Sequence, residues 1–166
     1  PLMFQPNDLT IAANGVIFAS DPDWKNRKGQ LWRIDTDGSS SLVEKDMGTT
    51  NGVEISPDQS RLYVNESAQR RVWVYDLDKK LQASNKRLLI QFPDFGLDGM
   101  RTDANGNLYI ARYGKGVIAK VSPDGKLLKE YKLKGEFPTN VTFSQKDPSL
   151  LYVTMQKRGA IELIKL

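Results

Sequence analysis

The chain has 166 residues, of which 39% are hydrophobic and 27% are charged, and its formal net charge is +4 at pH 7. That length and composition are ordinary for one globular domain. The chain contains no His and no Cys, which excludes a Ser-His-Asp triad, a cysteine nucleophile, zinc bound by imidazole or thiolate, and disulfides. Any catalysis must therefore use carboxylates and other oxygen groups.

The basic residues are spread through the expected turns and strand exteriors instead of forming one block. No basic segment with interleaved aromatic residues indicates a nucleic-acid partner, although the positive charge would favour an anionic substrate. No apolar run approaches the roughly 18 residues that a membrane helix needs, and no charged segment followed by an apolar stretch opens the sequence. We expect neither nucleic acid nor a membrane as partner, and nothing in the sequence indicates a compartment.

One pattern recurs four times along the chain. The copies begin near residues 6, 50, 97 and 138, and they read PNDLTIAANGVIFASD, TNGVEISPDQSRLYVNES, LDGMRTDANGNLYIARY and PTNVTFSQKDPSLLYVTMQ. Each copy has a polar step, an alternating strand, a tight turn built from Asn-Gly or a Pro/Asp pair, and a second apolar strand. This is the pattern of a β-hairpin.

A third expected strand follows each hairpin: LWRIDTDG, RVWVYDLD, VIAKVSPDG and AIELIKL. A fourth follows in three of the four repeats, as SLVEK, KRLLIQF and LLKEYKL. No segment shows the periodicity of an amphipathic helix. Four antiparallel strands repeated about every 45 residues are typical of a β-propeller blade. The sequence therefore predicts an all-β fold, with residues 1–166 forming one β-propeller domain of about four blades.

The polar step of each repeat stands at the same position relative to its first strand. In a propeller the first strand of each blade lines the central channel. The side chains of Asn7, Asn51, Asp98 and Thr139 should therefore meet at one mouth of that channel. Amide and carboxylate oxygens are ligands that Ca²⁺ prefers. Any single one of these residues is also an ordinary turn former, so the prediction rests on the set.

Two aromatic residues are expected near the same mouth. Trp24 and Tyr113 each follow an expected second strand and could form walls of a substrate pocket. The other aromatic residues considered lie inside expected strands, where packing between blades is the better explanation. They are Trp32, Tyr63, Trp73 and Tyr109.

The four repeats resemble the SMP-30/gluconolactonase/luciferin-regenerating-enzyme family. The segments PND, TNG-V-x-I-SPD, DGM-R-x-D-x-x-GNLYIA and PTN-V-x-F look like successive blades of that family, in order, through nearly the whole chain. The resemblance implies a six-bladed propeller that carries a divalent cation, usually calcium, at the channel mouth. It also implies hydrolysis of lactones, and the nearest pattern is that of a bacterial-type gluconolactonase.

Carried over residue by residue, the resemblance implies that Asn51 and Asp98 are metal ligands and that Asp98 is also the general base. Asn7 resembles the family's Asn that contacts the metal-bound water or the substrate and, in some members, the metal. Asp98 and Asn7 are thus the expected catalytic residues. Asp8 is expected to brace its loop.

The implied function is a calcium-dependent hydrolase that opens sugar-type lactones. Ca²⁺, or another divalent cation, would polarise the lactone carbonyl, and Asp98 would assist the attack of water. The expected substrate-binding residues are Asn7, Trp24, Tyr113 and Thr139. Two alternatives stay open: a calcium-stabilised binding propeller without chemistry, and a propeller esterase or phosphotriesterase.

One element of the family pattern has no counterpart in this sequence, namely a Glu ligand from a blade that precedes the PND segment. At roughly 45 residues per blade, we expect the chain to correspond to the last four of six blades, with PLMF as the tail of an earlier blade. Exposed blade faces would then need a missing N-terminal segment or a second copy of the chain as partner. The alternative is a closed four-bladed propeller in which PLMF completes the last blade. We expect little lactonase activity from the 166 residues alone.

Overall fold

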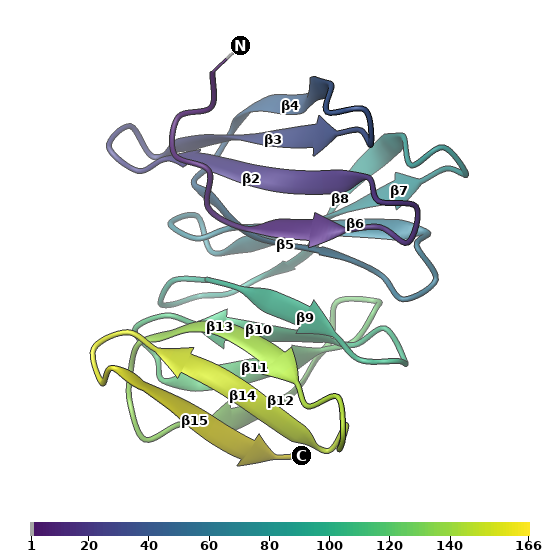
Figure 1. Cartoon of the computed structure of the whole chain (residues 1–166). Coiled ribbons are helices and arrows are strands. Elements are labelled where there is room, and N and C mark those ends of the chain that lie inside the picture. Colours follow the sequence, from purple (N-terminus) through teal and green to yellow (C-terminus); the bar gives the residue numbers. More distant parts are fainter. Residues whose placement is uncertain (1) are drawn as a thin grey trace.

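The computed structural model describes residues 2–166, and the predicted all-β fold is confirmed. These residues form fifteen strands in four antiparallel sheets (Figure 1). They include no helix that could cross a membrane. Within every sheet the strands follow one another in chain order, which is the up-and-down arrangement of a propeller blade.

The four sheets are numbered here as blades in chain order. Blade 1 contains β1 (Leu9–Ile11), β2 (Ile17–Asp23), β3 (Lys28–Ile34) and β4 (Ser40–Met47). Blade 2 contains β5 (Thr50–Ile55), β6 (Arg61–Glu66), β7 (Arg71–Leu77) and β8 (Ala83–Gln91). Blade 3 contains β9 (Met100–Thr102), β10 (Leu108–Arg112), β11 (Val117–Val121) and β12 (Leu127–Lys132). Blade 4 contains β13 (Pro138–Phe143), β14 (Leu150–Met155) and β15 (Ala160–Lys165).

Local turn chemistry explains where the hairpins fold back. In the Asn-Gly turn between β1 and β2, Gly15 has a φ of 89° and donates its N–H to the Ala12 carbonyl. Gly106 has a φ of 80° in the equivalent turn between β9 and β10 and donates to the Asp103 carbonyl. Glycine adopts this left-handed conformation without steric cost. The two Asn-Gly steps read from the sequence therefore close two of the predicted hairpins.

Three apolar clusters hold successive blades together. Phe18 and Leu31 of blade 1 pack with Val53 and Leu62 of blade 2. The next two clusters join blade 2 to blade 3 and blade 3 to blade 4, and they include Tyr63, Leu97, Met100, Ile110, Tyr109, Val141 and Leu151. Tyr63 and Tyr109 therefore lie in the packing between blades, as predicted. Trp32 is also buried, but it follows Leu31 and so lies on the opposite face of blade 1.

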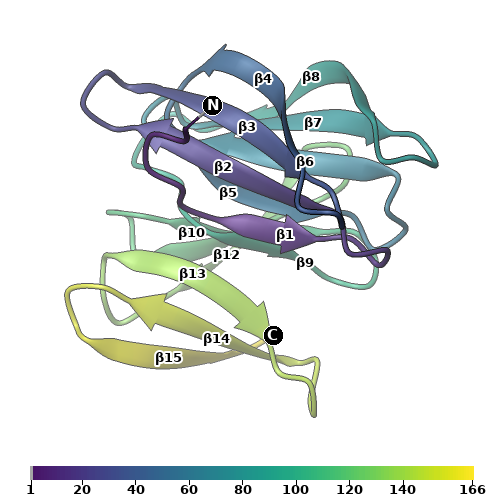
Figure 2. The ribbon, with the colours of Figure 1, turned by 45° about the horizontal axis from the view of Figure 1, so that its top comes forward.

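The N-terminal segment lies against blade 1. The Gln5 N–H donates to the Asp21 carboxylate at 2.7 Å, and the Asn7 N–H donates to the Ser20 carbonyl at 3.0 Å. Figure 2 shows blade 4 far from this end of the chain. Within residues 2–166 the sheet of blade 4 has three strands, with β15 at its edge. The alternative in which PLMF completes the last blade is therefore wrong for Leu2–Phe4, while Pro1 lies outside the described residues.

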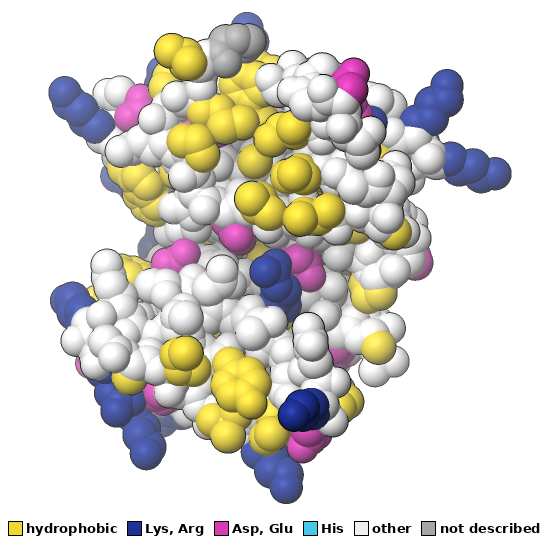
Figure 3. Space-filling view, viewed as in Figure 1, with side chains coloured by type: hydrophobic (Ala, Val, Ile, Leu, Met, Phe, Trp, Pro, Cys, Tyr) yellow, Lys and Arg dark blue, Asp and Glu magenta, His cyan; other side chains and the backbone are white. Residues whose placement is uncertain are grey.

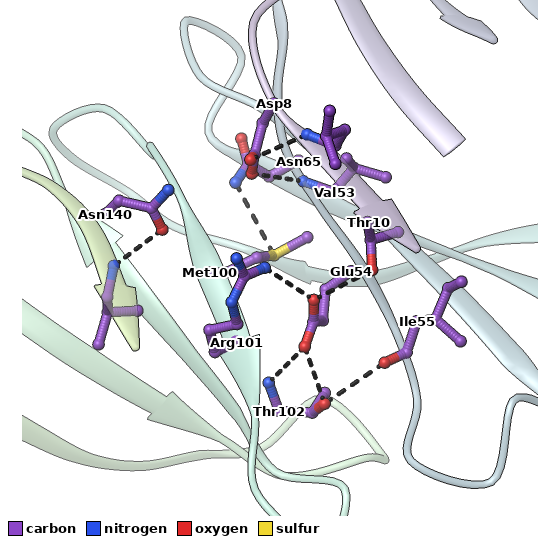
Figure 4. Close-up of polar contacts among 12 residues, drawn as sticks. Asp8, Thr10, Val53, Glu54, Ile55, Asn65, Met100, Arg101, Thr102 and Asn140 are labelled. Carbon is purple, nitrogen blue, oxygen red and sulfur yellow. Dashed lines mark hydrogen bonds and ion pairs between the residues drawn. The ribbon is translucent and has the colours of Figure 1, made fainter. Parts of the chain in front are cut away.

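The first strands of neighbouring blades contact one another, β1 with β5, β5 with β9, and β9 with β13. One buried carboxylate, that of Glu54 on β5, links three of them (Figure 4). It accepts hydrogen bonds from Thr10 Oγ1 of β1 at 3.4 Å and from Arg101 Nη1 of β9 at 3.1 Å. Thr102 of β9 donates both its N–H and its hydroxyl, each at 3.1 Å.

Burial raises the pKa of the Glu54 carboxyl, and the hydrogen bonds from Thr102 and the charge of Arg101 offset part of that rise. Figure 3 shows acidic and basic side chains meeting in the band between the upper pair of blades and the lower pair. A buried carboxylate with this many donors is costly to remove, because each donor loses its acceptor. Glu54 therefore stabilises the arrangement of blades 1, 2 and 3.

We expect Glu54→Ala to lower the free energy of unfolding by about 2 kcal/mol, because four hydrogen bonds between blades lose their acceptor. Urea denaturation measures this. Asp76→Ala is the control, since the ion pair of Asp76 with Arg87 is 43% and 45% exposed and such pairs contribute little. Equal loss of stability in both variants would contradict the linking role of Glu54.

Candidate functional site

A pocket of about 280 Å³ lies at one mouth of the channel between the four blades. Its lining residues are Asn7, Trp24, Asn51, Ser67, Asp98, Tyr113, Thr139 and Gln156. The structure thus brings all six site residues predicted from the sequence to one cavity. Their roles in binding and catalysis stay predictions.

The lining residues occupy two equivalent positions in each blade. The inner positions are those of the polar steps, at or just before the first strands, and hold Asn7, Asn51, Asp98 and Thr139. The outer positions come directly after the second strands and hold Trp24, Ser67, Tyr113 and Gln156. Sequence reasoning missed Ser67 and Gln156, although both stand at the repeat position that singled out Trp24 and Tyr113. Applying that position to all four repeats would have found them.

Two of the inner residues reach the pocket through β-bulges. The register of β5 against β6 shifts between Thr50 and Val53, a stretch that contains Asn51. The register of β13 against β14 shifts between Pro138 and Asn140, a stretch that contains Thr139. A bulge turns a side chain out of the regular alternation of the strand and is common next to active sites.

The Asn51 side chain is 2% exposed. Its Nδ2 donates a long hydrogen bond of 3.4 Å to the Leu97 carbonyl. Its Oδ1 has no hydrogen-bond partner among residues 2–166. Because buried polar atoms are nearly always paired, an unpaired acceptor in a residue that lines a pocket is compatible with a ligand that carries positive charge or a donor group.

The Asp98 side chain is half-buried and close to Asn51. It accepts the N–H of Gly99 at 3.0 Å. Burial raises the pKa of Asp98 to about 7, and repulsion from the Asp8 carboxylate adds to the rise, while the Gly99 N–H and the Asn51 amide lower it. Such a carboxyl binds a proton near neutral pH unless a cation replaces the proton.

Asn7 and Asp8, which precede the first strand of blade 1, have different surroundings. The Asn7 side chain is exposed at the pocket. The Asp8 carboxylate instead accepts the N–H groups of Leu9 at 2.9 Å and of Val53 at 3.3 Å (Figure 4). Burial raises the pKa of Asp8, and these two hydrogen bonds lower it. Asp8 thus braces its loop, as expected, and ties that loop to blade 2.

The opposite wall of the pocket is formed by blades 3 and 4. The Tyr113 hydroxyl donates to Gln156 Oε1 at 2.6 Å, and the Tyr113 ring packs edge-on against Phe137, with 5.1 Å between ring centroids. The hydroxyls of Thr139 and Thr154 share a hydrogen bond of 2.7 Å. These contacts hold an aromatic face and several polar groups in place at one side of the cavity.

The donor set of the pocket fits a hard divalent cation. It combines the Asp98 carboxylate, the unpaired Asn51 Oδ1 and the side-chain amide of Asn7. Ca²⁺ accepts both carboxylate and amide oxygens. Within the described chain, no three or more His, Cys, Asp or Glu side chains form a group that could hold a metal ion. A cation here would therefore depend on amide oxygens and one negative charge, and such a site binds weakly.

This chain is similar to known proteins over most of its length. Residues 3–157 match the model of the SMP-30/Gluconolactonase/LRE-like region. Pentonolactonase XacC of Haloferax volcanii is 32% identical over 151 residues, covering 89% of this chain and 52% of the relative. The gluconolactonase of Zymomonas mobilis is 33% identical over 145 residues, covering 74% of this chain and 40% of the relative. The chain therefore spans about half the length of these relatives, or less.

A solved structure shows the same fold. The calcium-binding protein regucalcin of Agrobacterium tumefaciens superimposes with a TM-score of 0.82 at 24% sequence identity, covering 90% of this chain and 52% of that protein. At this identity the likeness concerns the fold alone. It places the four blades described above within a known propeller architecture.

The raised pKa of Asp98 predicts how stability depends on pH in the presence of chelator. The native state keeps the Asp98 proton up to about pH 7, whereas the ordinary value is 3.8. Between these values the native state binds more protons than the unfolded state, so the free energy of unfolding falls as pH rises. Asp98→Asn removes this penalty. The gain in melting temperature over the wild type should be larger at pH 8 than at pH 5.

Asp124→Asn is the matched control, because Asp124 is an exposed carboxyl whose pKa is lowered by a hydrogen bond from Ser122. It should give no gain that grows with pH. The same gain for Asp98→Asn at both pH values would show that the Asp98 carboxyl is not shifted upward.

Proposed function

The chain belongs to the SMP-30/gluconolactonase/LRE-like family, and from this premise we propose that the protein hydrolyses sugar-type lactones with a bound divalent cation. The cation we propose is Ca²⁺. The carrying observation is that Asn7, Asn51 and Asp98 line one pocket and that the Asn51 Oδ1 atom has no hydrogen-bond partner among residues 2–166. Relatives named as a pentonolactonase and a gluconolactonase support the reaction class. Ca²⁺ is chosen because it accepts both carboxylate and amide oxygens.

Asn51, Asp98 and Asn7 would hold the cation. When bound, Ca²⁺ supplies a positive charge that polarises a carbonyl group and stabilises negative charge on its oxygen. In its deprotonated form the Asp98 carboxylate can accept a proton from water. Asp98 therefore has two parts in the proposal, as ligand and as proton acceptor.

The proposed reaction adds water to the lactone. A bond forms between the water oxygen and the carbonyl carbon while Asp98 accepts a proton from that water. The ring bond between the carbonyl carbon and the ring oxygen then breaks, and Asp98 returns the proton to the departing oxygen. The product is an open-chain hydroxy acid, and no oxidant or reductant is needed.

The remaining lining residues would bind the sugar ring. Tyr113 donates its hydroxyl to Gln156 Oε1, which leaves the Gln156 Nε2 group as a donor for a substrate oxygen. Thr139 and Asn7 offer further polar groups, and Trp24, which is 43% exposed, offers an apolar face. A polyol ring with one apolar face matches such a mixture of groups.

The first experiment tests whether the folded chain binds Ca²⁺ at this pocket. We expect Ca²⁺ to raise the melting temperature of the wild type relative to chelator, because a ligand bound by the folded state stabilises it. Asp98→Ala should lose this rise, and Asp124→Ala should keep it. Turnover of gluconolactone and of a pentonolactone, with and without chelator, then tests the reaction. A calcium-dependent rise without turnover of either lactone would favour the binding propeller over the hydrolase.

Tyr113→Phe tests the substrate-binding wall. The substitution keeps the ring and removes the hydrogen bond that orients Gln156. Loss of about 1 kcal/mol of binding corresponds to a KM about fivefold higher with kcat nearly unchanged. Tyr75→Phe is the control, because the Tyr75 hydroxyl bonds Glu44 outside the pocket. An unchanged KM in Tyr113→Phe would remove Gln156 from the proposed substrate contacts.

A further inference from the structure

Asn65 on β6 is fully buried and does not line the pocket. Its Nδ2 donates a hydrogen bond of 2.6 Å to the main-chain oxygen of Asp98, which belongs to the next blade. The same nitrogen lies 3.8 Å from the sulfur of Met100 (Figure 4). Its Oδ1 has no hydrogen-bond partner among residues 2–166. The side chain thus crosses the boundary between blades 2 and 3 to reach the backbone of the site.

This contact is possible because residue 52 is glycine and has no side chain. A Cβ atom at Gly52 would lie 2.5 Å from Asn65 Nδ2 and 2.5 Å from the Asp98 oxygen. Both distances are far shorter than any ordinary contact, so a side chain at this place would separate the donor from its acceptor. Gly52 lies in the same bulge as Asn51, so this short stretch of β5 contains both a pocket residue and the glycine that leaves room for the Asn65 contact.

The backbone around Asp98 is held from the other side as well. The Gly99 N–H, which is shared with the Asp98 carboxylate, donates to the Thr139 carbonyl of blade 4 at 2.8 Å. A Cβ atom at Gly99 would lie 2.3 Å from Asn140 Oδ1, so blade 4 also approaches closely. The Asp98 N–H donates to the Ala111 carbonyl within blade 3 at 2.9 Å. From blade 2, the contact with the Asp98 backbone is made by the Asn65 side chain, whereas the contacts from blades 3 and 4 are made by main-chain groups.

We propose that Asn65 is a positioning residue of the site: by holding the main chain of Asp98 against blade 2, it sets where the Asp98 carboxylate stands relative to Asn51 Oδ1. Its effect on cation binding and turnover rests on the function proposed above, but its effect on the backbone does not. Residues that orient ligands typically change metal affinity by tenfold or more when they are replaced. A carboxylate displaced by a fraction of an ångström also loses alignment with its reaction partners.

The test uses Asn65→Leu, which keeps the size of the side chain and removes the donor, and Asn65→Ser, which is too short to reach Asp98. Tyr75→Phe is the control, because it removes a part-buried hydrogen bond between blade 2 and blade 1 that lies away from the pocket. The first readout is hydrogen exchange of the Asp98 and Gly99 amides. The second is calcium affinity by calorimetry together with kcat for gluconolactone.

We expect exchange of both amides to be at least about tenfold faster in the Asn65 variants and unchanged in Tyr75→Phe, because only the former release the Asp98 backbone. We also expect calcium binding to weaken by about tenfold and kcat to fall in the Asn65 variants alone. Should Asn65→Leu fail to fold, Asn65→Ser gives the same comparison with less disturbance of packing.

Unchanged exchange at Asp98 and Gly99 would overturn the inference whatever the activity. Faster exchange combined with calcium affinity and kcat equal to those of Tyr75→Phe would also overturn it, since the backbone would then move without consequence for the site. The wild type could also neither bind Ca²⁺ nor open a lactone while the Asn65 variants still exchange faster. That result would support the contact of Asn65 with the Asp98 backbone and reject the proposed function. The two failures are therefore distinguishable.

Discussion

The close approach of first strands in neighbouring blades is the constraint on which the pocket depends. Gly52 and Gly99 stand where this approach leaves no room for a side chain. Polar groups then bridge the narrow gaps: Asp8 reaches the backbone of blade 2, and Glu54 collects donors from both adjacent blades. Apolar packing between sheets joins the blades, but these short polar bridges determine how their inner edges are placed against one another.

Three carboxylates near the channel have different surroundings, and the difference separates support from chemistry. Glu54 accepts hydrogen bonds from three residues, one of them a cation. Asp8 accepts two main-chain N–H groups. The Asp98 carboxylate receives the least compensation, and burial raises its pKa to about 7. A positive charge close to Asp98 would stabilise this carboxylate more than it would stabilise the other two, because Asp98 has the fewest favourable contacts.

The sequence predicts the blades well because their signals are local. Hairpin turns and alternating strands repeat at a steady spacing, so the polar steps fall at one mouth. Ser67 and Gln156 escaped prediction because neither residue type indicates chemistry unless its repeat position is compared with the other blades. Asn65 and Glu54 look like ordinary strand residues, since their partners lie more than thirty residues away. Contacts between blades have no signature within a single repeat.

The two sets of pocket positions have a consequence for how such a protein can change over generations. Three of the inner residues, Asn51, Asp98 and Thr139, lie in bulges or beside close contacts between blades, so a substitution there disturbs more than one blade. The outer residues Trp24, Ser67, Tyr113 and Gln156 each stand at the end of a separate hairpin, where a loop begins. Loop positions tolerate variation well. Under the proposed function, new substrate preferences could therefore arise one blade at a time, while the chemistry at the centre is inherited unaltered.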